Sequence, residues 1–341
     1  MNDFRIDILR NNIKIGEAFT ENIEIRFNES SQVMKGVRFN MKKIRMNGGY
    51  LFDFFKDRIR PMLIQGDNES PLGVFMVMAA PRTVSEVSDY YELEGYDETM
   101  LLKQAAFTSR TFYAAGTTYL SIINTLLTSV GFTNVIADNS AAVLPNDLEV
   151  AVGDNYLDFI NKLLDAINFR HVYEDASGAI RLSRIQNKTS PDFVYRSGKQ
   201  FNIIPPIKLN KDIYDLPNVV IGIWSSPDSN TPVVYTKRND DMNSVISTVN
   251  RGYEVVKTLN VYNIASSNEM KDYVDRIAFE SMQATESVTF ETVIEAGHEP
   301  GTALQVDTED IDGLFIENQW TMRVSQTAFR MQHTAERKGF V

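Results

Sequence analysis

Apolar and polar residues alternate with a period of two along most of the first hundred residues. Phe4, Ile6 and Ile8 form one such set. This period predicts half-buried β-strands, and the polar cluster at residues 28–31 supplies a turn. Pro61 argues against a helix or a central strand that continues through it. We therefore predict that this region is a small antiparallel barrel or sandwich.

Helical spacing replaces the alternation in the middle of the chain. It predicts one helix over residues 117–130, which ends at Gly131. A second apolar stripe, over residues 157–167, predicts another helix that Asp154 can cap. The period changes again after it, and residues 169–182 read as a β-hairpin. These elements form a compact α/β module.

The strand pattern returns towards the end of the chain. Residues 219–224, 286–295 and 319–325 are predicted strands, and residues 225–232 are an exposed turn. A capping box at residues 266–269 predicts one further helix among them. The predicted class is therefore α+β, mainly β.

The order of these patterns predicts three domains. Residues 1–104 would form an N-terminal β-barrel, residues 105–187 an α/β middle domain, and residues 188–341 a C-terminal β domain with one inserted helix. One short echo links the outer domains. Gly73-Val74-Phe75 and Gly313-Leu314-Phe315 each open a predicted strand, although chance is the better explanation for a match of three residues alone.

Composition and charge exclude several classes of protein. The chain has a formal net charge of -11, which disfavours tight binding to nucleic acid. It lacks cysteine, and therefore disulfides and thiolate sites. No apolar run is long enough to span a bilayer, and the first residues lack the pattern of a signal peptide, so we expect no export by the standard route.

Candidate chemical groups have local explanations. The acidic loop at residues 307–313 does not have the ligand spacing of a calcium loop, and a solvated turn is favoured. Asp158 and Asp165 lie on the polar side of the predicted helix, while His171 is typical of a structural histidine. His171, His298 and His333 are far apart in sequence, so we expect no zinc site. We assign no catalytic, cofactor-binding or metal-binding residue and expect no cofactor.

Three stretches carry a resemblance to a known family. They are residues 58–104, where a strand region turns at Gly95-Tyr96-Asp97, residues 114–182, with the paired helices, and residues 295–324, with a Pro-Gly turn before Gly313. In this order the chain resembles phage baseplate hub proteins of the gp27 and gpD type. The most similar are hubs of Gram-positive phages and defective prophages, the XkdQ and YqbQ kind.

The resemblance implies an assembly role. In such hubs the two outer domains share one barrel-like fold with the tail tube protein, so a homotrimer presents six similar domains. It would join the sixfold tail tube to the threefold spike and form part of the DNA channel. The expected partners are tube, spike, tape measure and other baseplate proteins, in the tail of a virion or tailocin assembled in the host cytoplasm.

The resemblance carries over no catalytic residue. The sequence also offers no region similar to a lysozyme or peptidase, so a cell-wall enzyme would be another polypeptide. The alternatives are a hexameric distal tail or tube-completion protein, a tail-associated peptidoglycan hydrolase, and, less favoured, a module that binds the host surface.

Overall fold

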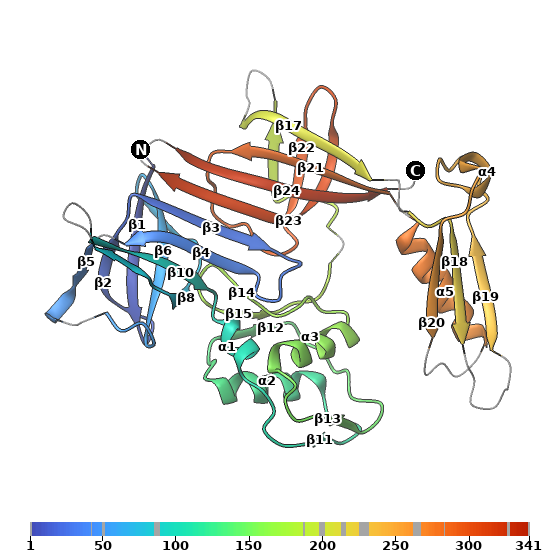
Figure 1. The fold of residues 1–341 in the computed structure, drawn as a ribbon, viewed down its shortest axis with the longest axis horizontal. Helices are drawn as coiled ribbons and strands as arrows, with labels where there is room; N and C mark the ends of the chain where they lie inside the picture. Colours follow the sequence, from blue (N-terminus) through green and yellow to red (C-terminus); the bar gives the residue numbers. More distant parts are fainter. Residues whose placement is uncertain are drawn as a thin grey trace. The chain divides into compact units, whose positions relative to one another are not determined.

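A computed structural model describes residues 2–41, 43–49, 52–84, 89–186, 188–197, 202–212, 216–224, 232–261, 267–282, 284–325 and 328–339. The chain divides into two compact units. The larger unit holds residues 1–206 and 290–334, and the smaller holds residues 207–289 and 335–341. Strands dominate both, so the predicted α+β, mainly β class is confirmed (Figure 1). The boundaries at residues 104 and 187 stay a prediction.

The alternating residues near the N-terminus form strands because every second side chain meets one core. Ile6 and Ile8 of the first strand are fully buried, as is Phe75 further on. We call these elements the first β segment, drawn in blue to teal in Figure 1. It comprises β1 Asn2–Arg10, β2 Ile13–Phe19, β3 Asn22–Asn28, β4 Lys35–Met41, β5 Lys43–Met46, the 3-10 turn η1 Asn47–Gly49, β6 Asp57–Gln65, β7 Asn68–Pro71, β8 Phe75–Ala79, β9 Arg82–Val84 and β10 Asp89–Tyr96.

The prediction that Pro61 interrupts a central strand is wrong. Pro61 lies in the middle of β6, opposite Ile6 of β1. Its carbonyl accepts a hydrogen bond from the Leu72 N–H, on the side of the strand away from β1. On that side β6 changes partner from β7 to β8. The N–H that proline lacks would point to this same side, so the ladder between β6 and β1 loses no hydrogen bond.

The predicted helices of the middle region are present. Thr118 caps α2, because its side-chain oxygen accepts from the Ser121 N–H, and Gly131 ends the helix with a φ of 102°. The expected cap of α3 was wrong by one residue: Asn155, rather than Asp154, accepts from the Asp158 N–H at 2.8 Å. The helices are α1 Thr99–Gln104, α2 Tyr119–Val130 and α3 Tyr156–Ala166.

The predicted hairpin follows α3. Tyr173 and Glu174 pair antiparallel with Ile180 and Arg181, and the side chain of Asp175 accepts backbone hydrogen bonds across the turn. The apolar faces of the helices pack on this hairpin in one core. The short strands are β11 Thr111–Tyr113, β12 Val135–Ala137, β13 Leu148–Val150, β14 Tyr173–Glu174 and β15 Ile180–Leu182.

The strands that follow the middle region form what we call the second β segment. It comprises β16 Phe193–Arg196, β17 Ile203–Asp212, β21 Ala284–Thr292, β22 Ala303–Asp307, β23 Asp312–Ser325 and β24 Phe329–Gly339. The acidic loop is the turn between β22 and β23, closed by a hydrogen bond from the Thr308 N–H to the Ile311 carbonyl. This agrees with the predicted solvated turn.

The two β segments repeat one strand order. Neighbouring strands of the first run β3-β4-β10-β8-β6, and those of the second run β17-β21-β24-β23-β22. Numbered along the chain, the two orders correspond strand for strand. In each segment the first strand in the chain adds beside the strand named last in this order. β1 pairs with β6 and β16 pairs with β22, although the first pair is antiparallel and the second is parallel.

The echo noted in the sequence lies at equivalent places in this order. Gly73 lies two residues before the start of β8, and Gly313, 240 positions later, is the second residue of β23. The same spacing relates the start of β10 at Asp89 to the start of β24 at Phe329. Phe75 and Phe315 are both fully buried. The repeat is therefore structural, and chance is no longer the better explanation.

The two segments join in one sheet. Strand β3 pairs antiparallel with the later part of β23, from Asn28 opposite Gln319 to Asn22 opposite Ser325. Trp320 is buried there, with its ring centroid 5.7 Å from that of Phe27. Both ends of the chain thus contribute to the core of the larger unit.

The smaller unit holds a three-stranded sheet and the predicted helix. Gly222 permits close packing, because a Cβ there would lie 2.4 Å from Val274 of the helix. Ser266 of the predicted capping box and most of the predicted turn at residues 225–232 lie outside the described residues. The elements are β18 Val219–Trp224, β19 Val233–Arg238, α4 Thr248–Arg251, β20 Val256–Val261 and α5 Ser267–Ser281. Across the described ranges, the helices are too short or too polar to span a membrane.

Candidate functional site

The groups considered from the sequence have local roles. His171 is exposed, and its Nε2 lies 3.2 Å from Asp165. Asp158 accepts a hydrogen bond from Asn155 within the cap of α3. The backbone carbonyl of Asp154 accepts from the Phe107 N–H. These contacts support the structural interpretation of the middle helix and its flanks.

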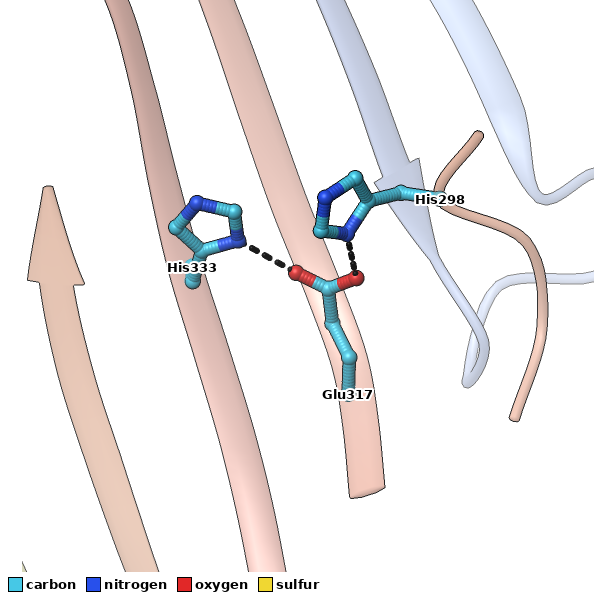
Figure 2. Close-up of side chains that lie close together, drawn as sticks. All are labelled: His298, Glu317 and His333. Atoms are coloured by element: carbon cyan, nitrogen blue, oxygen red, sulfur yellow. Dashed lines mark hydrogen bonds and ion pairs between the residues drawn. The ribbon is translucent and has the colours of Figure 1, made fainter. Parts of the chain in front are cut away.

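The structure instead brings together two distant histidines and a glutamate (Figure 2). His298 lies in the loop after β21, Glu317 on β23 and His333 on β24. The Nδ1 atom of His298 is 2.6 Å from Glu317 Oε2, and Nδ1 of His333 is 2.6 Å from Oε1. All three side chains are fully buried. We call these residues the His-Glu-His cluster.

The outer nitrogens of both rings have hydroxyl partners. His298 Nε2 lies 3.2 Å from the Tyr195 hydroxyl, which donates to Glu295 Oε2 at 2.9 Å. His333 Nε2 lies 2.9 Å from Thr292 Oγ1. Aromatic rings enclose the cluster, with the Phe193 and Phe290 rings stacked on His298 and His333 respectively, so these ring faces are shielded from water.

Burial and hydrogen bonding act in opposition on the cluster. Burial raises the pKa of the Glu317 carboxyl, but the hydrogen bonds from both histidines outweigh it, and this pKa falls below its usual range. Burial lowers the pKa of His333 by more than Glu317 raises it. Burial, with Glu295 next, raises the pKa of the Tyr195 phenol, which therefore stays protonated.

Two histidines and a carboxylate are also the ligands that zinc prefers. Tetrahedral zinc with bonds of about 2.0–2.1 Å places its ligand atoms ~3.3 Å apart. The two N···O contacts of 2.6 Å are shorter and have the length of charge-assisted hydrogen bonds. The geometry therefore fits shared protons better than one metal ion.

A second buried group of charges connects the two β segments to the middle region. The Lys35 ammonium, on β4, donates to the Glu174 carbonyl at 2.9 Å and to Glu299 Oε2 at 3.1 Å. Asp97 accepts from the Lys35 backbone N–H at 2.9 Å. We call Lys35, Asp97, Glu174 and Glu299 the junction cluster.

The junction cluster contains more carboxyl groups than cations. Burial raises the pKa of Asp97, and burial followed by the charge of Asp97 raises that of Glu174 well above its usual value. Glu174 Oε2 accepts from the Glu98 N–H, while Oε1 has no hydrogen-bond partner among the described residues. A protonated Glu174 avoids a second buried negative charge beside Asp97.

The sequence contained one signal for the His-Glu-His cluster. At the spacing of 240, Glu317 corresponds to Val77 and His333 to Leu93, both apolar and buried in the first β segment. A polar residue at an equivalent core position marks an unusual site. Helical or strand periodicity in the sequence could not predict that His298 joins the cluster, because His298 lies in a loop.

The comparisons concern the whole chain. No protein-family model matches it, and no curated protein is significantly similar in sequence. A tail protein of Neisseria meningitidis has a similar structure, with a TM-score of 0.71 at 11% identity, over 99% of this chain and 97% of its own. The 43 kDa tail protein of the Shewanella oneidensis prophage MuSo2 has a TM-score of 0.70 at 10% identity, over 98% of each chain.

A more distant likeness is to a component of the type VI secretion system of E. coli, described as structurally similar to the T4 tail proteins gp27 and gp5. Its TM-score is 0.54 at 10% identity, over 96% of this chain and 76% of its own. At these identities the likeness concerns the fold. The chain therefore has the fold of phage tail proteins, along nearly its whole length, as the resemblance in the sequence predicted.

Proposed function

We propose that this chain is a structural protein of a phage tail or phage-tail-like particle. Specifically, it would be the baseplate hub, a homotrimer between the tail tube and the spike. The proposal rests on the shared fold with tail proteins and on one observation above all, the repeated strand order of the two β segments. Residues 1–104 and 188–341 would be the two tube-like domains, and residues 105–187 the middle domain.

The repeat gives a physical reason for a trimer. Three chains with two similar β segments present six similar units around one axis. Such a ring matches a sixfold tube on one side, while its true threefold symmetry matches a spike on the other. A chain with a single segment would need six copies for the same ring and would offer no threefold face.

The joint between the segments suggests how copies would meet. Within the chain, β3, the outermost strand of the first β segment, pairs with residues 319–325 of β23, and an ion pair of 2.9 Å between Arg323 and Glu24 supports this pairing. In the repeated strand order, β17 of the second segment occupies the place that β3 has in the first. At the spacing of 240, β9 corresponds to Met322–Val324, which is the part of β23 that pairs with β3. In the described part of the chain, β17 ends the sheet and β9 pairs only with β10. We expect β17 of one copy to add beside β9 of the next.

The acidic charge suits a channel. A lumen that repels phosphate would let DNA pass without binding, and the net charge of -11 is consistent with this role. The partners would be the tube protein, the spike, the tape measure and other baseplate proteins, in a virion tail assembled in the host cytoplasm. The role needs no cofactor and no catalysis.

Native mass spectrometry tests the proposal directly. We expect an assembly of three 38.7 kDa chains, either for the purified protein or after the spike and tube proteins are added. Six copies would support a tube-completion protein instead. A single chain in the presence of both partners would refute the hub.

Zymography on cell walls tests the enzyme alternative, because a cleared band that one carboxylate substitution abolishes would establish a hydrolase.

A further inference from the structure

We propose that the His-Glu-His cluster holds one proton more than two neutral imidazoles and a carboxylate hold. The second β segment would then contain a buried imidazolium–carboxylate pair, and its stability would fall as the pH rises. The observed contacts require a definite number of hydrogens on the two rings and the carboxylate, and this number leads to the extra proton. It does not depend on the proposed function.

The count begins at His298. Tyr195 has one hydroxyl hydrogen and donates it to Glu295 Oε2 at 2.9 Å. The Tyr195 oxygen must therefore accept from His298 Nε2, which carries a hydrogen. On the other side of the ring, Nδ1 is 2.6 Å from a Glu317 oxygen, so a second hydrogen lies between them. Two hydrogens on one ring make an imidazolium.

The count ends at His333. Its Nδ1 atom is also 2.6 Å from Glu317 and requires a hydrogen there. The one hydrogen of the Thr292 hydroxyl can reach either the Val293 carbonyl at 2.8 Å or His333 Nε2 at 2.9 Å. Donated to Nε2, it satisfies this ring as a neutral imidazole, the form that burial favours for His333. The cluster thus holds three ring protons and the carboxylate holds none.

The surrounding charges are compatible with this state. Glu295, behind Tyr195, and Asp192, before β16, are acidic groups that act on the cluster from neighbouring elements. Asp192 accepts from the Ala303 N–H and pairs with Lys188. With three protons the cluster itself is neutral, whereas with two it would be a fully buried anion beside Glu295. Burial of an uncompensated charge is strongly unfavourable.

The proton count sets the direction of the pH dependence. Above about pH 6.5 the unfolded chain has two neutral histidines, so the folded cluster binds one proton more. The equilibrium for opening of the second segment should then rise tenfold per pH unit, as the proton leaves to water. The first segment has Val77 and Leu93 at the corresponding positions and should not respond in this way.

Nitrogen-15 spectra of histidine rings test the proton count. The chain has only three histidines, so a deuterated sample gives three assignable rings, with exposed His171 as the reference. At about pH 8 we expect one ring of the cluster to carry two hydrogens and the other to carry one, at Nδ1. Glu317→Gln should remove the charged ring. Two singly protonated rings in the wild type, or stoichiometric zinc in the purified protein, would overturn the proposal.

Hydrogen exchange tests the consequence for stability. Between about pH 7 and pH 9, protection of residues 315–325 relative to residues 75–79 should fall tenfold per pH unit. The variant H298L/E317V/H333L, which places apolar residues in the cluster, should abolish this fall. If that variant does not fold, the wild-type ratio decides alone. A ratio that is constant with pH would refute the inference.

Discussion

His298 and Glu299 are neighbours in the chain, yet their side chains enter two different buried clusters. His298 contacts Glu317 in the core of the second β segment. The Glu299 carboxylate accepts from the Lys35 ammonium and from the Ala176 N–H of the middle hairpin. One loop thus fixes the second β segment to both other parts of the larger unit. Changes at the junction cluster should therefore be felt beyond it.

Lys35→Met is expected to destabilise the larger unit strongly. The Lys35 side chain is 3% exposed and is the cation that faces Glu299 and the Glu174 carbonyl. Its removal leaves the buried Asp97 and the partly buried Glu299 without this counter-charge, which costs about 3 kcal/mol in the free energy of unfolding. Urea denaturation at neutral pH measures this change.

Lys56→Met is the matched control for that variant. Lys56 is 74% exposed and lies 3.8 Å from Asp53, so its loss should leave the urea midpoint unchanged. If Lys35→Met behaved like Lys56→Met, the junction cluster would contribute nothing to stability.

Glu174→Gln is expected to stabilise the protein at neutral pH and to reduce its pH dependence. Burial raises the pKa of Glu174 above its ordinary value of 4.5, so the folded state keeps a proton that the unfolded chain releases. The contribution of Glu174 to the free energy of unfolding is therefore greatest below pH 4.5 and is lost as the pH rises through the pKa of the folded state. Glutamine resembles the protonated acid at every pH. Unfolding free energies at about pH 4.5 and pH 8 should therefore differ less in the variant.

Glu309→Gln provides the control, because Glu309 is exposed in the turn between β22 and β23. It should leave the pH dependence as it is in the wild type. An unchanged pH dependence in Glu174→Gln would show that Glu174 is ionised in the folded protein.

The sequence predicted the helices and strands better than it predicted the tertiary contacts between them. Alternation placed β1 and β3, and helical spacing placed α2 with its end at Gly131, because these signals are local. Pro61 was misjudged because the cost of a missing N–H depends on which neighbour the strand has at that point. The His-Glu-His cluster was missed because its members come from a loop and two strands, which only the tertiary fold brings together.

Gly301→Ala is expected to cost more stability than Gly116→Ala. Both glycines have a positive φ, +78° and +84°, so each substitution incurs about 1 kcal/mol of backbone strain. At Gly301 an added Cβ would also lie 2.0 Å from Arg170 Nη2, whereas at Gly116 it meets nothing within 4 Å.

The difference between the two glycine variants reports on one ion pair. Arg170 holds Glu29 at 2.8 Å, and displacing its guanidinium should add at least ~1 kcal/mol of destabilisation. Thermal unfolding of both variants measures the difference. Equal melting temperatures would mean that Arg170 moves aside without loss.

Val84→Lys is expected to prevent the proposed trimer while leaving the chain folded. Val84 lies on β9 and is 66% exposed, and its counterpart Val324 is paired with Ile23 of β3 within the chain. If β17 of a neighbouring copy adds beside β9, Val84 becomes covered, and a lysine there opposes the pairing of edges. Val234→Lys is the control, since Val234 is 57% exposed on β19 of the smaller unit. Native mass spectrometry, under the conditions in which the wild type forms three copies, should show single chains for Val84→Lys and trimers for Val234→Lys. A trimer of Val84→Lys with undiminished stability would place the joint between copies at another edge.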